Sequence, residues 1–416
     1  MLRHGLLVAC LVGCSATSRN VPPPQTRVLP VREITEYSQA TSPEIYLRTT
    51  QDVLPGGLAA AMAPILVDWE QSDPRAEGGS YVIRNLNEGG NPLGGTTVLR
   101  SARIPADRIE RAEFILVPLD PMGVGGAVAH GMLRFVFSKN RPGRLLGPMG
   151  DELGAGSELE DLILSWEAWR PPGVDFDFIK GMDAKNFGLS LRAYSGRQRF
   201  LEDALGKRDW YAYELSLPGA GRGVSELLYD TLALGDGTGR HVLAEIFSQE
   251  ADEWLSHAPG GGDDPALLRA RWEELMTAIR DFDEPEDGRL RLEKEDRNYQ
   301  TIRRSCSTMA LYCINVATER LLQQGLGSGQ GMKPTSPAIM EPVAPWMTEM
   351  AHMTTWEIFL VAPKAVDYLI DNVTVIPTKV PRALEQAGLL AGDAKAVHYS
   401  LAGTAPYGDL RSILIR

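Results

Sequence analysis

Cys306 is the residue that the sequence places best for acting as a nucleophile. It opens the segment CSTMALYCINVATERLL, whose apolar residues recur every three or four positions, as in an amphipathic helix. A thiol at a helix N-terminus feels the positive end of the helix dipole, which favours the thiolate, and Arg303 and Arg304 stand just upstream. Ser305 or Ser307 would cap the helix. The alternative interpretation is an inert, buried cysteine.

A second cysteine, Cys313, follows seven residues later on the same side of the predicted helix. At about 1.5 Å of rise per residue the two Cα atoms are roughly 10 Å apart. A disulfide needs Cα atoms within about 7 Å of each other. We therefore expect both thiols to stay reduced, with Cys313 a small core residue among apolar neighbours.

A thiolate nucleophile needs a base, usually histidine, and His130 has the most suitable setting of the six histidines. It follows a Gly-rich approach and opens HGMLRFVF, residues 130–137, whose alternation of side chains is typical of a strand. The other histidines lie in an export-like leader, beside charged helical segments, or in settings without a distinctive pattern: His4, His241, His257, His352 and His398.

The base in turn needs an orienting group, and the strand-like run DLILSWEAW, residues 161–169, offers two candidates. Ser165 and Glu167 alternate with apolar residues, so both belong to one face of the strand. If this strand pairs with residues 130–137, one of the two reaches the imidazole of His130. The alternative role for Glu167 is a salt bridge to Arg134 or Arg170.

These residues must be positioned by a mixed fold. Three alternating runs, at 130–137, 161–169 and 210–218, predict an antiparallel sheet. Beyond residue 225 the apolar spacing becomes helical, with a first helix that stops at Gly235. We therefore expect an α+β fold, with residues 53–330 as one catalytic domain. Residues 331–416 would form a C-terminal extension or complete the same domain.

Composition excludes several functions. The 416 residues carry a formal net charge of −12, which disfavours nucleic acid as a partner. The sequence contains no HExxH and no CxxC pair, and its Gly-rich loops do not join a strand to a helix as a P-loop does. We expect no metal and no cofactor. Nothing in the sequence predicts an oligomeric state.

The N-terminus resembles an export signal. MLRHGLLVACLVGC has a short basic start and an apolar core, and Leu11 to Cys14 has the form of a lipobox. Residues 1–14 would be a lipoprotein signal peptide, with Cys14 acylated and anchored in the membrane lipid. Residues 15–52 are rich in Ser, Thr and Pro and predict a flexible tether. A plain secretory signal and a buried first strand are the alternatives. Ser15 after the cysteine weakly favours the outer membrane.

The ordered motifs resemble the Lnb N-terminal periplasmic domain family of bacterial envelope proteins. AHGMLRFVF, LILSWEAWRPPG, FDFIKGMD, RDWYAYELSLP and RRSCSTMALYCI follow one another as that family's motifs do, over about residues 110–325. Two departures stand out. Ser305 replaces the usual asparagine before the cysteine, and SLRAYSGR lacks the acidic residues of the matching section.

The resemblance implies a circularly permuted papain-like (NlpC-like) fold, in which the base His130 precedes the nucleophile Cys306 along the chain. It also implies a periplasm-facing, lipid-anchored thiol acyltransferase or hydrolase. The most concrete activity is N-acylation of lipoproteins, in which a phospholipid donates an acyl chain through a thioester. The alternatives are a peptidoglycan amidase or peptidase, and an envelope scaffold without catalytic activity.

Overall fold

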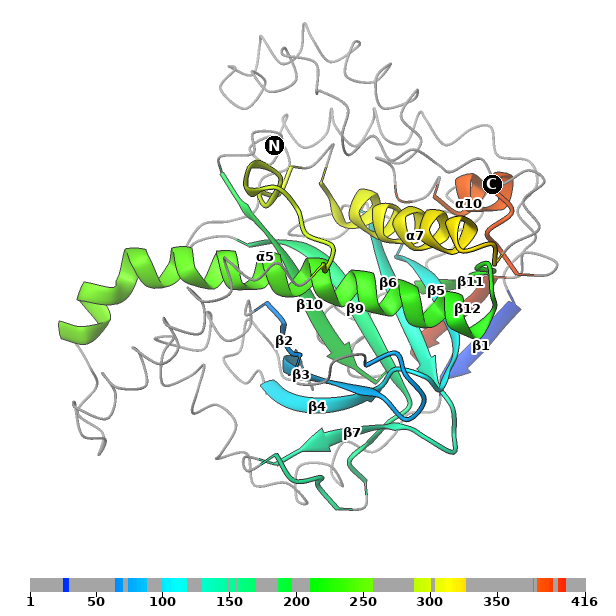
Figure 1. Cartoon of the computed structure of the whole chain (residues 1–416), viewed down its shortest axis with the longest axis horizontal. Helices are drawn as coiled ribbons and strands as arrows, with labels where there is room; N and C mark the ends of the chain where they lie inside the picture. The colour runs from blue at the N-terminus through cyan, green and yellow to red at the C-terminus, as the bar shows by residue number, and fades with distance from the viewer. Residues whose placement is uncertain are drawn as a thin grey trace, which may run out of the picture.

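The computed structural model shows a mixed α+β architecture, a large and mostly antiparallel sheet with few helices, as predicted (Figure 1). It describes residues 25–29, 64–69, 74–87, 99–117, 129–147, 150–154, 156–169, 186–196, 210–256, 288–300, 304–326, 377, 380–391 and 396–401. The candidate lipidation site Cys14, the signal peptide, Arg170, Arg303 and the strand-like runs at 357–363 and 372–378, apart from residue 377, lie outside this part of the chain.

Within the described residues the sheet has twelve strands, in the spatial order β1-β12-β11-β5-β6-β9-β10-β3-β4-β7-β8, with β2 paired to β3. Two of the pairings among these described strands are parallel, β1 with β12 and β3 with β10. The strands are β1 (Gln25–Leu29), β2 (Leu66–Asp68), β3 (Ser80–Asn87), β4 (Leu99–Pro105), β5 (Ile109–Val117), β6 (His130–Phe137), β7 (Gly143–Leu146), β8 (Glu158–Leu159), β9 (Asp161–Trp169), β10 (Gly188–Ser195), β11 (Trp210–Glu214) and β12 (Ala396–Leu401).

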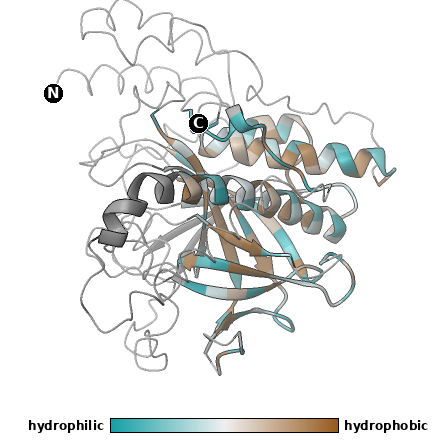
Figure 2. Ribbon diagram, turned by 60° about the vertical axis from the view of Figure 1, so that its left-hand side comes forward, coloured by the Kyte–Doolittle hydropathy of each residue, from teal (hydrophilic) through white to brown (hydrophobic). Residues whose placement is uncertain are grey.

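The central strands carry apolar residues on both faces, and almost all of these residues are buried. On β6, Leu133 and Phe135 belong to the large core beneath the helices, whereas Met132 belongs to a smaller cluster with Ile163 and Trp210. The hydropathy colouring in Figure 2 shows the hydrophobic residues concentrated along these strands. The alternation that predicted strands 130–137 and 161–169 is confirmed, since these are the bounds of β6 and β9.

The helix α5 (Gly221–Ser256) is continuous, so the predicted stop at Gly235 is wrong. Glycine serves close packing here. A Cβ at position 235 would lie 2.2 Å from Leu191 Cδ2 on β10, and one at Gly239 would lie 2.5 Å from Ile65 O. The helix therefore approaches the sheet more closely than any side chain at these two positions would allow.

The helix α7 (Cys306–Gln323) lies beside α5 over the same face of the sheet and contacts β6 and β9 (Figure 1). Ser305 is its N-cap, and the Ser305 N–H donates to Thr308 Oγ1 at 2.7 Å. Since the Ser305 N–H lies just before the helix, this bond fixes the entry of the chain into the first turn. Cys306 is thereby held as the first helical residue, as the sequence predicted.

Both ends of the described chain join this sheet. β1 lies within residues 15–52, which we expected to be a tether, yet Gln25–Leu29 pairs along its whole length with β12. From residues 331–416, β12 pairs with β11, and α10 (Val380–Gln386) buries Val380 and Leu384 in the large core. The segment that we expected to be a flexible tether therefore includes one strand, β1, which forms backbone hydrogen bonds with β12.

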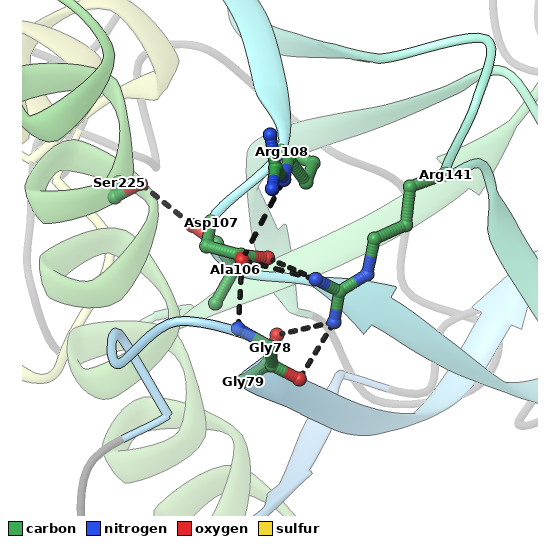
Figure 3. Close-up of polar contacts among 7 residues, drawn as sticks. All are labelled: Gly78, Gly79, Ala106, Asp107, Arg108, Arg141 and Ser225. Atoms are coloured by element: carbon green, nitrogen blue, oxygen red, sulfur yellow. Dashed lines mark hydrogen bonds and ion pairs between the residues drawn. The ribbon is translucent and has the colours of Figure 1, made fainter.

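A network of polar contacts joins three loops to the first turns of α5 (Figure 3). Arg141 Nη1 donates to both carboxylate oxygens of Asp107, at 2.7 and 3.0 Å, and Arg141 Nη2 donates to Gly78 O at 2.6 Å. Asp107 in turn accepts from the Gly78 N–H at 2.7 Å, and Ser225 of α5 donates to Ala106 O at 2.6 Å. These bonds attach α5 to the turn between β4 and β5.

No helix within the described ranges is both long enough and apolar enough to cross a membrane.

Candidate active site

Cys306 begins α7 directly above the first residues of β6. An added Cβ at Gly131 would lie 2.9 Å from the ring of Phe114 and 3.3 Å from Ser307 Cα. Only glycine therefore lets the strand approach the first turn of the helix this closely. Cys306 is 6 % exposed and forms no disulfide. The sulfur is thus enclosed between a helix N-terminus and the start of a strand.

His130 lies beside this sulfur, so the structure brings together the predicted nucleophile and the predicted base. The two side chains are joined by a hydrogen bond. Burial raises the pKa of Cys306, but the charge and hydrogen bond of His130, together with the N–H groups of Gly131 and Ser307, outweigh burial and leave the pKa below its ordinary value. This environment favours a thiolate paired with an imidazolium.

Ser165 and Glu167 both join the site, one behind the other, rather than one of them alone. His130 Nε2 lies 2.8 Å from Ser165 Oγ, and Ser165 Oγ donates to Glu167 Oε1 at 2.9 Å. The pairing of β6 with β9 sets Leu133 opposite Leu164, which brings the start of β6 beside the end of β9. Strand pairing thus aligns His130, Ser165 and Glu167 along one line of side chains, and α7 brings Cys306 to the end of that line.

The hydrogen bonds along this line run in one direction, from His130 through Ser165 to Glu167. Burial raises the pKa of Glu167, but Arg192, His130 and the hydroxyls of Tyr194 and Ser165 outweigh burial and hold the pKa below its ordinary value. An ionised carboxylate only accepts, so the single proton of Ser165 goes to Glu167. Ser165 Oγ must then accept from His130 Nε2–H. The Nδ1 atom is left as the ring nitrogen that faces Cys306, as a base requires.

Of the two salt bridges that we weighed as the alternative role of Glu167, the one to Arg134 is not formed, and Arg170 lies outside the described residues. Arg134 is fully buried and pairs with Glu113 and Asp161, at 2.6 and 2.8 Å. The ion pair of Glu167 is with Arg192, whose Nη1 lies 2.7 Å from Oε2. Both oxygens of the Glu167 carboxylate are therefore engaged within the site.

Three residues of this site were missed from the sequence: Arg192, Tyr194 and Tyr299. Arg192 and Tyr194 are on β10, and the Tyr194 hydroxyl donates to Glu167 Oε1 at 2.8 Å. The alternation of side chains in SLRAYS, residues 190–195, could have indicated that Arg192 and Tyr194 share one face of a strand. That face becomes informative only once β10 is known to lie beside β9.

Tyr299 lies close to both ends of the line. Its backbone N–H donates to Phe187 O at 2.9 Å, which attaches the segment before α7 to the start of β10. The side chain is 7 % exposed. Burial raises the pKa of Tyr299, and the charges of Cys306 and Glu167 raise the pKa further, so the phenol keeps its proton.

Arg304, which we expected to favour the thiolate, pairs with a neighbouring loop. Arg304 Nη1 pairs with Asp296 at 2.5 Å, and Nε donates to Asn298 O at 2.7 Å. These bonds attach the start of α7 to the loop around the short helix η4 (Lys294–Asp296). The leading contributions that lower the pKa of Cys306 come from His130 and from the N–H groups of Gly131 and Ser307.

Cys313 has a contrasting environment. It is fully buried in the large core, and burial raises the pKa of its thiol to about 12. The nearby carboxylate of Asp230 raises the pKa as well, although a hydrogen bond with Thr231 opposes this. Cys313 is thus an unreactive core thiol on the same helix as Cys306, which makes it a matched control for labelling.

The described residues include no group of three or more His, Cys, Asp or Glu side chains that could hold a metal ion. The N–H of Cys306, as the first helical residue, has no acceptor among the described residues.

Comparison of the chain with protein-family models, with curated proteins and with solved structures gave no match. The functional argument therefore depends on the residues and their geometry.

Proposed function

We propose that this protein is a cysteine-dependent acyltransferase or hydrolase, with Cys306 as nucleophile and His130 as base. One observation carries the proposal: the line from Glu167 through Ser165 to His130 ends at a thiol held at a helix N-terminus. A nucleophile, a base and an anchored orienting group in this order are what thiol catalysis requires. The order of base and nucleophile along the chain supports the permuted papain-like arrangement and the resemblance to the Lnb family.

The chemistry follows from the protonation states. The Cys306 thiolate attacks the carbonyl carbon of an acyl ester, and the N–H of Cys306 stabilises the oxyanion. When the carbon–oxygen bond breaks, the leaving alcohol takes the proton from His130 Nδ1, and a thioester remains. An acceptor then attacks the thioester and gives a proton back to Nδ1. The carbon–sulfur bond breaks, and the thiolate is restored.

His130 lies beside apolar residues of the core. Val117 is the register partner of His130, and Ile115 and Met132 lie next to them in the same buried apolar cluster. A phospholipid as donor and the amine of a lipoprotein as acceptor fit this setting, as does lipid anchoring at Cys14. With water as the acceptor, the same chemistry would be ester hydrolysis. If Cys306 attacked a peptide carbonyl, the amine left with the proton of His130 and water then hydrolysed the thioester, the reaction would be peptidoglycan cleavage.

Thiol labelling tests the nucleophile. The full chain is treated with iodoacetamide between pH 5 and 9, and alkylation is followed by mass spectrometry of the intact protein. We expect one fast site, with a midpoint below the ordinary thiol pKa of about 8.5. The fast phase should vanish in Cys306→Ser and persist in Cys313→Ser. Alkylation of Cys306 at the rate of a free thiol would instead indicate a scaffold without catalysis.

Acyl transfer is tested with phospholipid vesicles as the donor and no acceptor present. We expect a mass increase equal to one acyl chain on Cys306 that hydroxylamine removes, and no such adduct in His130→Ala. Fast alkylation without an acyl adduct, together with cleavage of peptidoglycan fragments, would replace the acyltransferase by an amidase or peptidase.

A further inference from the structure

The strand β10 contributes a second layer of side chains behind the line of site residues. In the pairing of β10 with β9, Arg192 lies opposite Ser165, and Tyr194 lies opposite Ile163. Each contacts a different oxygen of Glu167: the Tyr194 hydroxyl donates to Oε1 at 2.8 Å, and Arg192 Nη1 lies 2.7 Å from Oε2. A hydrogen bond also joins Arg192 to Tyr194.

We propose that Arg192 and Tyr194 are positioning residues, which hold Glu167 as an oriented anion so that His130 keeps Nδ1 directed at Cys306. The inference rests on the proposed function and extends it to β10. The Arg192 guanidinium can only donate, so it donates a hydrogen bond to the Tyr194 hydroxyl, and that hydroxyl donates a hydrogen bond to Glu167. Glu167 therefore accepts hydrogen bonds from β10 on one side and from Ser165, which accepts from His130, on the other.

Glu167 needs two such partners because the direction of the hydrogen bonds from His130 through Ser165 to Glu167 can be reversed. Glu167 is a largely enclosed carboxylate, with 22 % of its side chain exposed, and burial favours its neutral form. A protonated Glu167 would donate to Ser165, and Ser165 would then donate to His130 Nε2. The imidazole would carry its proton on Nδ1, facing the sulfur, and could no longer accept the proton of the thiol. Arg192 and Tyr194 prevent this reversal because they stabilise the anion.

A purely structural role for the pair is a cross-strand contact that fastens β9 to β10. The two roles differ in one readout. Fastening two strands affects stability, whereas orienting the line sets the pH at which Cys306 becomes a nucleophile. The test therefore measures the pH profile of Cys306 alkylation in the full chain, with iodoacetamide as the probe, and the tautomer of His130 from the 15N shifts of its ring.

The variants are Arg192→Gln, Tyr194→Phe and the charge-retaining Arg192→Lys. Tyr213→Phe is the control, because Tyr213 is another buried tyrosine of the sheet, on β11, and is 2 % exposed. We expect Arg192→Gln to shift the pH midpoint of Cys306 alkylation to a value about one unit higher, as the loss of a neighbouring charge does. Tyr194→Phe should move it the same way by less, since the ring stays. Arg192→Lys should restore most of the wild-type profile, and Tyr213→Phe should leave it unchanged.

In both Arg192→Gln and Tyr194→Phe, the population of the His130 ring should shift toward the Nδ1–H tautomer. An unchanged profile and tautomer in folded Tyr194→Phe and Arg192→Gln would overturn the inference. If Arg192→Gln does not fold, Tyr194→Phe decides, because it removes one oxygen atom and keeps the packing. If the wild-type chain itself shows no fast alkylation, the proposed function fails, and that result is distinct from a failure of the inference.

Discussion

Asp230 should make the stability of this protein depend on pH in a window set by one buried carboxylate. It lies on α5, fully buried against α7, with Arg320 Nη1 at 2.8 Å from Oδ1. Burial raises the pKa of Asp230 to about 6, and Glu226 adds to the rise, whereas Arg320 and Arg75 oppose it. The usual value of 3.8 applies in the unfolded chain. The folded state therefore holds this proton to higher pH than the unfolded state does.

The sign follows from proton linkage. A raised pKa contributes stability that is fully present below about pH 4 and is lost as the pH rises through about 6. A shift of about two units corresponds to roughly 3 kcal/mol in total. Between pH 5 and pH 8 the loss is about 1.4 kcal/mol. Asp230→Asn removes this titration, so its stability relative to the wild type should rise by that amount between the two pH values.

The assay is urea denaturation of both proteins at pH 5 and pH 8, followed by tryptophan fluorescence. Comparing the variant with the wild type cancels other groups, including Asp236, whose pKa burial also raises. The exposed Glu110→Gln should show no such change. The reasoning would be refuted if Asp230→Asn differed from the wild type equally at both pH values, or lost stability on going from pH 5 to pH 8.

Three further substitutions, one of them with a control, test contacts that hold the fold around the site and away from it. Gly131→Ala should slow Cys306 alkylation and cost roughly 1–3 kcal/mol of stability, whereas Gly221→Ala, where a Cβ meets no atom within 4 Å, should cost nothing. Gly235→Ala should lower the melting temperature, because its contact with Leu191 outweighs the gain of about 1 kcal/mol in helix propensity. Arg141→Met should cost about 1–2 kcal/mol in denaturant unfolding through lost bonds to Asp107, with no effect on alkylation.

The sequence predicted the local elements of the site well, because local patterns determine them. Alternation set the bounds of β6 and β9, and helical spacing with Ser305 as cap placed Cys306 in the first turn of α7. Side-chain alternation also predicted that Ser165 and Glu167 share a face. Each of these inferences uses a period of two or 3.6 residues within one segment.

The error at Gly235 arose because a distant segment decides the outcome. The sequence around Gly235 is typical of a helix end, and the closeness of Leu191 on β10 explains why glycine is needed inside the helix instead. Two other contacts could not be predicted from local sequence: the pairing of Arg304 with Asp296, and the pairing of β1 with β12. Tertiary contacts of this kind override local signals.

The arrangement of strands also explains why His130 and Cys306, the proposed base and nucleophile, can meet although they lie far apart in the chain. β6, β9 and β10 are neighbours in the sheet, so residues from three separate segments form one line of side chains. That line still needs a sulfur at its end, and the only addition required is a helix whose first turn touches β6. Gly131 and Tyr299 provide this: glycine removes the steric barrier, and the Tyr299 backbone attaches the segment before α7 to the start of β10. The position of Cys306 is therefore set by β6 and β10 together, and loosening either contact should separate the thiol from His130 while leaving the sheet intact.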